Sequence, residues 1–317
     1  MAEDFQSGWQ LTESDPGVFS ELLTRLGTPL VVDDLYALDP ASLAEHKPIQ
    51  AFIFLFQWVP THSATVSGQY DHDFPGFFAH QVVNNACATL AVLNAIGNIP
   101  DLPMATDLAD LISFSSGMDP QSRGLVMTSS DWLREAHNAL SPPASISLED
   151  PTLNKTSDEA YHFIVYMPFM GCVYEFDGLK EAPIRHDPYS ESGEGWVSKA
   201  REIIEARIQT YPPGSLNFNL LALHNDPIPE LQRQIAEFNA SGNTAAAAEI
   251  SAKLFRENHK RQQWAFENSL RRHNHIGLIH GLLKALAKAG KLNDAKSGAK
   301  KVLQERRAKK TDSMEED

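Results

Sequence analysis

The residue whose type best suits covalent chemistry is Cys87, one of two cysteines among 317 residues. It lies near the start of an Ala- and Leu-rich segment, residues 84–97, which ends at a glycine and predicts a buried helix. A cap at Asn84 or Asn85 places the sulfur in the first turn, where backbone N–H groups and the helix dipole stabilise a thiolate. The alternative is a small core side chain, the commoner role of a cysteine in such a helix.

Three further residues fit a thiol mechanism. Gln81, six positions before the cysteine, can donate to a developing oxyanion, with the Cys87 N–H as second donor. His162 and Asp177 lie in two β-type runs around a turn at 168–171. With that turn centred between residues 169 and 170, an unbulged hairpin sets them directly opposite, with Cβ atoms roughly 4.5–5.5 Å apart. Asp177 then orients the imidazole as general base, and the alternative is a surface His–Asp pair, which is common and weak.

A thiolate beside an imidazole performs acyl transfer, and chemistry alone leaves the substrate open among peptides, isopeptides and small amides. No HExxH motif, CxxC pair or His/Cys cluster has metal-ligand spacing, and no phosphate-binding loop is visible. We therefore expect neither a metal nor a cofactor. Two cysteines suit a reducing compartment, the longest apolar stretch is too short to span a bilayer, and the N-terminus lacks the features of a secretory signal.

The expected elements mix helices and strands, an α/β class. Residues 141–161, with three prolines and no periodicity, predict a mobile loop. After residues 226–229 (Asp-Pro-Ile-Pro) the pattern is helical only. The other expected elements are a capped helix from Asp15-Pro16 to Gly27, a buried strand at 51–58, a helix at 131–140, a helix at 198–210, a strand at 215–224, and helices at 244–272 and 279–290.

Charge also changes near residue 227. Residues 1–226 contain 10 Lys and Arg against 30 Asp and Glu, whereas residues 227–317 contain 17 against 11. The acidic part favours a basic partner and is a poor surface for nucleic acid, although both parts could simply be solvated surfaces. The break, the charge reversal and the loss of strands predict a module boundary there.

Four motifs resemble those of the ubiquitin C-terminal hydrolases (peptidase C12), in that family's order. The segments are the opening WQLTESDPGVF from Trp9, the stretch QVVNNACAT containing Gln81 and Cys87, the run YHFIVY around His162, and the run YEFDGL around Asp177. The resemblance covers roughly residues 7–226, with no departure at the four positions that carry chemistry. RHNHI at 272–276 and LIHGLLKALAKAG at 278–290 resemble the C-terminal helical domain of the long, proteasome-associated form, and a plain amphipathic extension is the alternative.

The resemblance implies a papain-like cysteine protease fold with a knotted backbone and an all-helical C-terminal extension. Residues 1–226 would be the catalytic domain, with 141–161 as a crossover loop that limits substrate size. Residues 227–317 would be the extension, with a docking region at about 270–310 for a ubiquitin receptor of the proteasome regulatory particle. It implies a cysteine-type deubiquitinase that cleaves (iso)peptide or thioester bonds after the C-terminal glycine of ubiquitin, whose arginine-bearing tail suits an acidic groove.

Ubiquitin and its conjugates are thus the expected partners, in cytoplasm and nucleus, with no membrane and no nucleic acid. Three alternatives stay open. The chain could be a catalytically silent scaffold that binds ubiquitin or the proteasome, a thiol enzyme acting on another amide, or a deubiquitinase restrained by its own tail.

Overall fold

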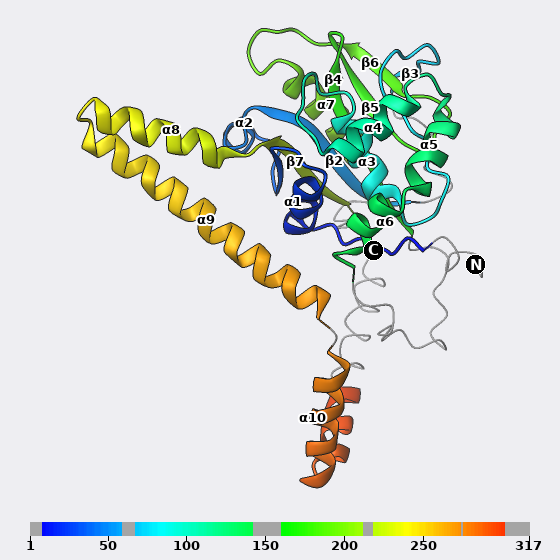
Figure 1. The fold of residues 1–317 in the computed structure, drawn as a ribbon, viewed down its shortest axis with the longest axis vertical. Coiled ribbons are helices and arrows are strands. Elements are labelled where there is room, and N and C mark those ends of the chain that lie inside the picture. Colours follow the sequence, from blue (N-terminus) through cyan, green and yellow to red (C-terminus); the bar gives the residue numbers. More distant parts are fainter. Residues whose placement is uncertain (1–7, 59–66, 142–159, 212–217, 274, 302–317) are drawn as a thin grey trace. The chain divides into compact units, whose positions relative to one another are not determined.

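A computed structural model describes residues 8–58, 67–141, 160–211, 218–273 and 275–301 of the protein (Figure 1). Most of the predicted crossover loop and the end of the basic tail lie outside this part of the chain. The described residues form two compact units, one extending to Arg272 and the other beginning at His273.

The larger unit combines helices with one antiparallel sheet, so the predicted α/β class is confirmed. Its helices are α1 (Pro16–Arg25), α2 (Pro40–Ala44), α3 (Cys87–Ile96), α4 (Thr106–Ser115), α5 (Pro120–Ser129), α6 (Asp131–Asn138), α7 (Trp196–Ile208), α8 (Pro227–Ala240) and α9 (Thr244–Arg272). Its strands are β1 (Leu30–Asp34), β2 (Ile49–Trp58), β3 (Gln69–Tyr70), β4 (Ala160–Phe169), β5 (Cys172–Phe176), β6 (Ile184–Pro188) and β7 (Phe218–Asn225). Residues 160–161, expected in the loop, therefore begin β4.

The sheet has the strand order β1-β7-β2-β4-β5-β6-β3, and all the pairs are antiparallel. Successive side chains of a strand point to opposite faces. Accordingly, Ile53 of β2 packs with α1 and α3 to α6, whereas Phe52 and Phe54 pack with α2 and α7. The strands are apolar on both faces because helices cover both, as the aromatic run at 51–58 predicts.

Helix α1 begins and ends as its sequence indicates. Asp15 Oδ1 accepts a hydrogen bond from Val18 N at 3.1 Å, and Pro16 occupies the first turn, where its missing N–H costs nothing. Gly27 adopts φ +75°, the left-handed conformation that closes a helix at no steric cost to glycine. The helix buries Phe19 and Leu23 against the sheet.

The last two helices of the larger unit, α8 and α9, run side by side (Figure 1). Helix α9 returns to α1, where Asn268 Nδ2 donates to Gly17 O and to Glu21 Oε2, both at 3.0 Å. The last strand of the sheet ends at Asn225, close to the predicted module boundary at residue 227. These contacts nevertheless join the polypeptide up to Arg272 to the same compact unit, because α9 packs on α1.

The smaller unit contains α10 (Ile276–Lys288), followed by a glycine at φ +68°. The helix carries exposed apolar side chains, among them Leu278, Leu282 and Leu283. Within the described residues, no helix combines the length and the apolar character needed to cross a bilayer.

Candidate active site

Cys87 is the first residue of α3, so the predicted place of the sulfur in the opening turn is confirmed. The predicted cap is wrong, because Ala86 occupies the cap position and no side chain caps the helix. Asn85 instead adopts φ +64°, a conformation that asparagine tolerates better than most residues, and its Nδ2 donates to Trp9 O at 3.1 Å. The N-terminal segment is thereby tied to the turn that carries the sulfur.

His162 lies near the start of β4, and Asp177 follows β5 directly. His162 Nε2 and Asp177 Oδ1 are 2.6 Å apart, with 4% and 5% of the two residues exposed. The Cys87 thiol lies near enough to the ring to raise the pKa of His162, and Cys87 is 8% exposed. With Nε2 on the carboxylate, Nδ1 is the nitrogen left for the sulfur. The sequence-predicted histidine, aspartate and cysteine therefore meet in one nearly closed site.

The β4–β5 hairpin, which brings His162 close to Asp177, has a different strand register from the predicted one. Met170 and Gly171 have φ of 46° and 80°, which makes a two-residue turn centred between them, one position later than expected. The pairing of Val165 with Phe176 then sets His162 diagonal to Asp177 and not opposite it. Because a shift of two pairing positions preserves the face of the sheet, both side chains still project to the same side.

Burial and charge act against each other at this pair. Burial, the largest influence, favours a neutral imidazole, but hydrogen bonds and charges from Asp177 and Cys87 raise the pKa of His162 from 6.5 to about 9. Burial likewise opposes the Asp177 charge, yet the hydrogen bond and charge of His162, with the Leu179 N–H, hold the pKa of Asp177 below 3.8. Both shifts favour an imidazolium paired with a carboxylate.

Gln81 lies on the segment that leads into α3 and is anchored beside the aspartate. Its N–H donates to Gly178 O at 2.8 Å, one residue beyond Asp177. A Cβ on Gly178 would meet Gln81 N at 3.1 Å and Gln81 Cβ at 3.2 Å, so a glycine permits this close approach. Gln81 Oε1 is buried and, in the part of the chain that the structure describes, has no hydrogen-bond partner. Such an unsatisfied buried group is typical of a site built for a ligand.

Sequence analysis does not identify two residues that contribute to this arrangement, Gly178 and Asn85. Gly178 was visible only as part of an Asp-Gly pair after a strand, a signal that usually indicates no more than a turn. Asn85 is one of the two asparagines that the sequence offers as a helix cap, whereas its contact with Trp9 joins residues 76 positions apart. No local pattern reports a contact at that separation.

The fold and the buried cysteine–histidine–aspartate arrangement are of the cysteine protease class. The sequence pattern of the family described as "Ubiquitin carboxyl-terminal hydrolase, family 1" matches residues 9–209. A second pattern, "Ubiquitin carboxyl-terminal hydrolases", matches residues 247–292. The chain belongs to the ubiquitin carboxyl-terminal hydrolases, which confirms the resemblance read from its motifs.

Similar proteins share nearly the whole length. Ubiquitin carboxyl-terminal hydrolase 2 of Schizosaccharomyces pombe is 36% identical over 284 residues, 88% of this chain and 91% of that one. Ubiquitin carboxyl-terminal hydrolase isozyme L5 of Dictyostelium discoideum is 30% identical over 94% of this chain and 97% of that one. The crystal structure of Trichinella spiralis UCH37 bound to ubiquitin vinyl methyl ester superposes with a TM-score of 0.66 at 32% identity, covering 81% of this chain and 99% of that one.

Proposed function

We propose that this chain hydrolyses the bond after the C-terminal glycine of ubiquitin, with Cys87 as nucleophile, His162 as general base and acid, and Asp177 orienting the ring. The observation that carries the proposal is the buried 2.6 Å contact of His162 with Asp177 beside a helix-start thiol. The T. spiralis relative, solved with a ubiquitin vinyl methyl ester, supports ubiquitin as the substrate class.

The first half of the reaction forms a thioester. The Cys87 thiolate attacks the glycine carbonyl, and the resulting oxyanion accepts hydrogen bonds from the Gln81 amide and from the Cys87 N–H. Collapse of the tetrahedral intermediate breaks the bond to the leaving amine, which takes its proton from the His162 imidazolium. The raised His162 pKa keeps that proton available at neutral pH.

The second half restores the enzyme. His162, now neutral, removes a proton from a water molecule that attacks the thioester carbonyl. The sulfur leaves as a thiolate, and ubiquitin departs with a free C-terminal carboxylate. Asp177 holds the same ring through both halves, since each requires one ring nitrogen to face the reacting atoms.

Steady-state hydrolysis of ubiquitin carrying a C-terminal fluorogenic amide tests the proposal. The whole chain should turn this substrate over, and Cys87→Ser should abolish turnover. Cys172→Ser is the matched control, because Cys172 is a free, half-buried thiol at the start of β5. Turnover that survives in Cys87→Ser would rule out the proposed nucleophile.

The alternatives predict different outcomes of related assays. A silent scaffold would bind ubiquitin without releasing the fluorophore. An enzyme for another amide would react with short peptide electrophiles as readily as with ubiquitin-derived ones. A deubiquitinase restrained by its tail would gain activity when residues 273–317 are deleted, and an unchanged rate would dismiss that restraint.

We further propose that α10 recruits the enzyme to a ubiquitin receptor of the proteasome regulatory particle. Support comes from the apolar face of this helix, where Ile279, Leu282 and Leu283 are 37%, 55% and 49% exposed. Leu282→Asp should abolish co-purification with the regulatory particle and leave hydrolysis of the fluorogenic substrate unchanged, whereas retained co-purification would refute this docking face. Such an enzyme would reside in the cytoplasm and the nucleus, a proposal that fractionation of the tagged chain checks.

A further inference from the structure

A second cluster of reactive side chains lies where α9 meets the β1–β7 edge of the sheet. Asp33 of β1, His46 after α2 and His224 of β7 each offer one donor atom, and these atoms all lie within 4.8 Å of one another. Asp33 and His224 are 9% and 5% exposed. His224 pairs with Val31 in the sheet, so Asp33 is its diagonal neighbour on the same face.

The hydrogen-bonding pattern of His224 resembles that of a metal ligand. Its Nδ1 lies 2.9 Å from Asn225 O, and its Nε2 lies 3.0 Å from Asp33 Oδ2. A neutral imidazole has one N–H, so if Nδ1 donates to the carbonyl, Nε2 presents a lone pair to a carboxylate oxygen. A cation between these atoms, either a proton or a metal ion, resolves that repulsion. Metal-binding histidines commonly donate their second ring nitrogen to a backbone carbonyl in this way.

The separations suit a small divalent ion. Donors at about 2.0–2.2 Å from one tetrahedral zinc ion lie roughly 3.3 Å from each other. Asp33 Oδ2 is 3.0 Å from His224 Nε2 and 3.7 Å from His46 Nδ1. His46 Nδ1 is the more distant of the two ring nitrogens from Asp33 Oδ2, so a small movement of this ring would complete the set. Two imidazoles and one carboxylate with an open position form a known zinc-binding set.

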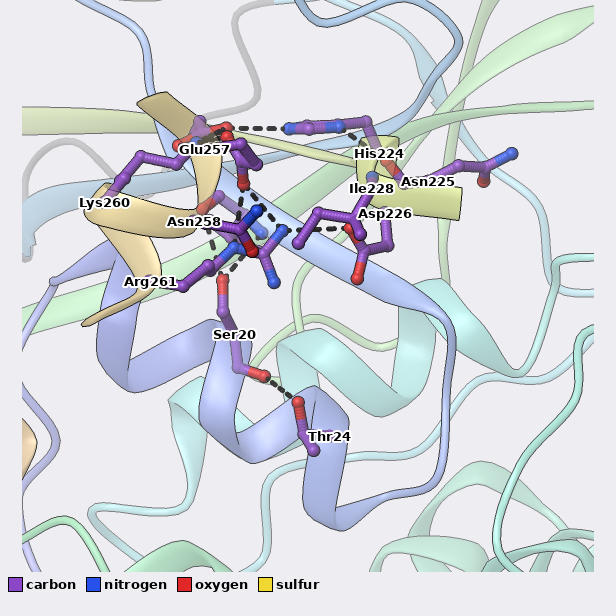
Figure 2. Close-up of polar contacts among 12 residues, drawn as sticks. Ser20, Thr24, His224, Asn225, Asp226, Ile228, Glu257, Asn258, Lys260 and Arg261 are labelled. Carbon is purple, nitrogen blue, oxygen red and sulfur yellow. Dashed lines mark hydrogen bonds and ion pairs between the residues drawn. The ribbon is translucent and has the colours of Figure 1, made fainter. Parts of the chain in front are cut away.

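In the structure, the positive charge beside Asp33 is the ammonium group of Lys260. Lys260 Nζ of α9 donates to both oxygens of Asp33, at 2.8 and 2.9 Å. Burial opposes the Asp33 charge, but His224, His46 and Lys260 together hold the pKa of Asp33 well below 3.8. Glu257 Oε2 lies 2.7 Å from Lys260 Nζ, so the ammonium keeps a partner when it leaves Asp33. Figure 2 shows Lys260 and Glu257 on α9, to the left of His224.

We propose that Asp33, His46 and His224 bind a zinc-like divalent ion, and that this ion displaces the Lys260 ammonium from Asp33. Loss of the Lys260–Asp33 ion pair then loosens α9 at this point. The exchange follows from Coulomb repulsion, because an ammonium and a dication cannot share one carboxylate without mutual cost. Sequence spacing conceals the site, since its donors stand at positions 33, 46 and 224 on three separate segments.

Zinc titration of the whole chain by calorimetry tests this proposal, with Co²⁺ absorption reporting tetrahedral coordination. The Cys87→Ser background removes the thiol–imidazole site as a competitor for the metal. His46→Ala should weaken zinc binding more than about tenfold, because even groups that only orient zinc ligands contribute 10- to 100-fold. Lys260→Met should tighten binding by roughly two- to fivefold, the range expected for removing one partly exposed ion pair.

The matched control is His72→Ala, since His72 also lies near a carboxylate, Glu181, at 3.7 Å, but is 63% exposed. That variant should bind zinc as the parent does. Hydrogen exchange gives a second readout: zinc should accelerate exchange in α9 around residues 257–264 in the parent and not in His46→Ala. Identical titrations of His46→Ala and the parent would overturn the site, and unchanged affinity in Lys260→Met would overturn the exchange.

Discussion

Asp177→Asn isolates the charge of the carboxylate from its geometry. An asparagine oxygen can still accept a hydrogen bond where Asp177 Oδ1 lies, 2.6 Å from His162 Nε2, while the negative charge is lost. Burial lowers the pKa of His162, and that charge is one of the influences, with the hydrogen bonds of Asp177 and Cys87, that raise it from 6.5 to about 9. Without the charge, the influences that raise the pKa weaken, and burial, the largest influence, should bring the pKa of the ring down toward its ordinary value.

The size of the effect follows from protonation. At about pH 7.5, a ring with a pKa of about 9 is roughly 97% protonated, and a ring with a pKa of about 6.5 is roughly 10% protonated. Because acylation uses the imidazolium, kcat/KM for the fluorogenic ubiquitin substrate should fall by at least about tenfold at this pH. The alkaline limb of its pH profile should move from about 9 to below about 7.

A matched control and a stability measurement complete the test. Asp187→Asn removes a carboxylate whose side chain is 85% exposed and should leave the profile unchanged. Since folding raises the pKa of His162, its stabilising effect is full below about 6.5 and disappears as pH rises through about 9. The difference in unfolding free energy between parent and Asp177→Asn should shrink over that range. An alkaline limb that stays near 9 in Asp177→Asn would refute the reasoning.

Three other predictions follow from the contacts described above. Gln81→Ala should lower kcat by about 10²–10³ with little change in KM, as loss of one oxyanion donor does, and a change confined to KM would contradict that role. Gly17→Ala should destabilise the fold by about 1–3 kcal/mol in thermal melts, because its Cβ would stand 2.8 Å from Trp264 Cγ, and an unchanged Tm would exclude the clash. Asn268→Ala should cost about 1–3 kcal/mol in urea unfolding by removing one buried and one partly buried hydrogen bond, whereas Asn258→Ala, at an exposed position of α9, should be nearly neutral.

Much of the fold and of the site could be predicted from local sequence patterns. The Asp15-Pro16 start of α1, the aromatic strand β2 and the Thr244–Arg272 helix are signalled by caps, periodicity or β-branched content, which act over a few residues. The same local patterns correctly predicted that Cys87 lies at a helix start and that His162 lies near Asp177. Period-2 alternation explains why an error of one position in the turn centre preserved the sheet face of both residues.

The failures concern information that is not local. The turn at Met170-Gly171 requires two left-handed residues, and methionine gives no hint that it adopts φ +46°. The boundary near residue 227 is predicted from local composition. The packing of α9 on α1 is not, because it depends on a contact between Asn268 and Gly17, which are 251 positions apart. The Asp33–His46–His224 cluster likewise exists only after the strands pair.

Treatment of the whole chain with a ubiquitin-derived vinyl methyl ester, followed by peptide mass spectrometry, tests the central claim most directly. One adduct should form, its mass should equal one ubiquitin, and it should map to Cys87, with Cys172 unmodified and no adduct in Cys87→Ser. An adduct on Cys172, or labelling that persists in Cys87→Ser, would contradict a mechanism built on the thiol at the start of α3.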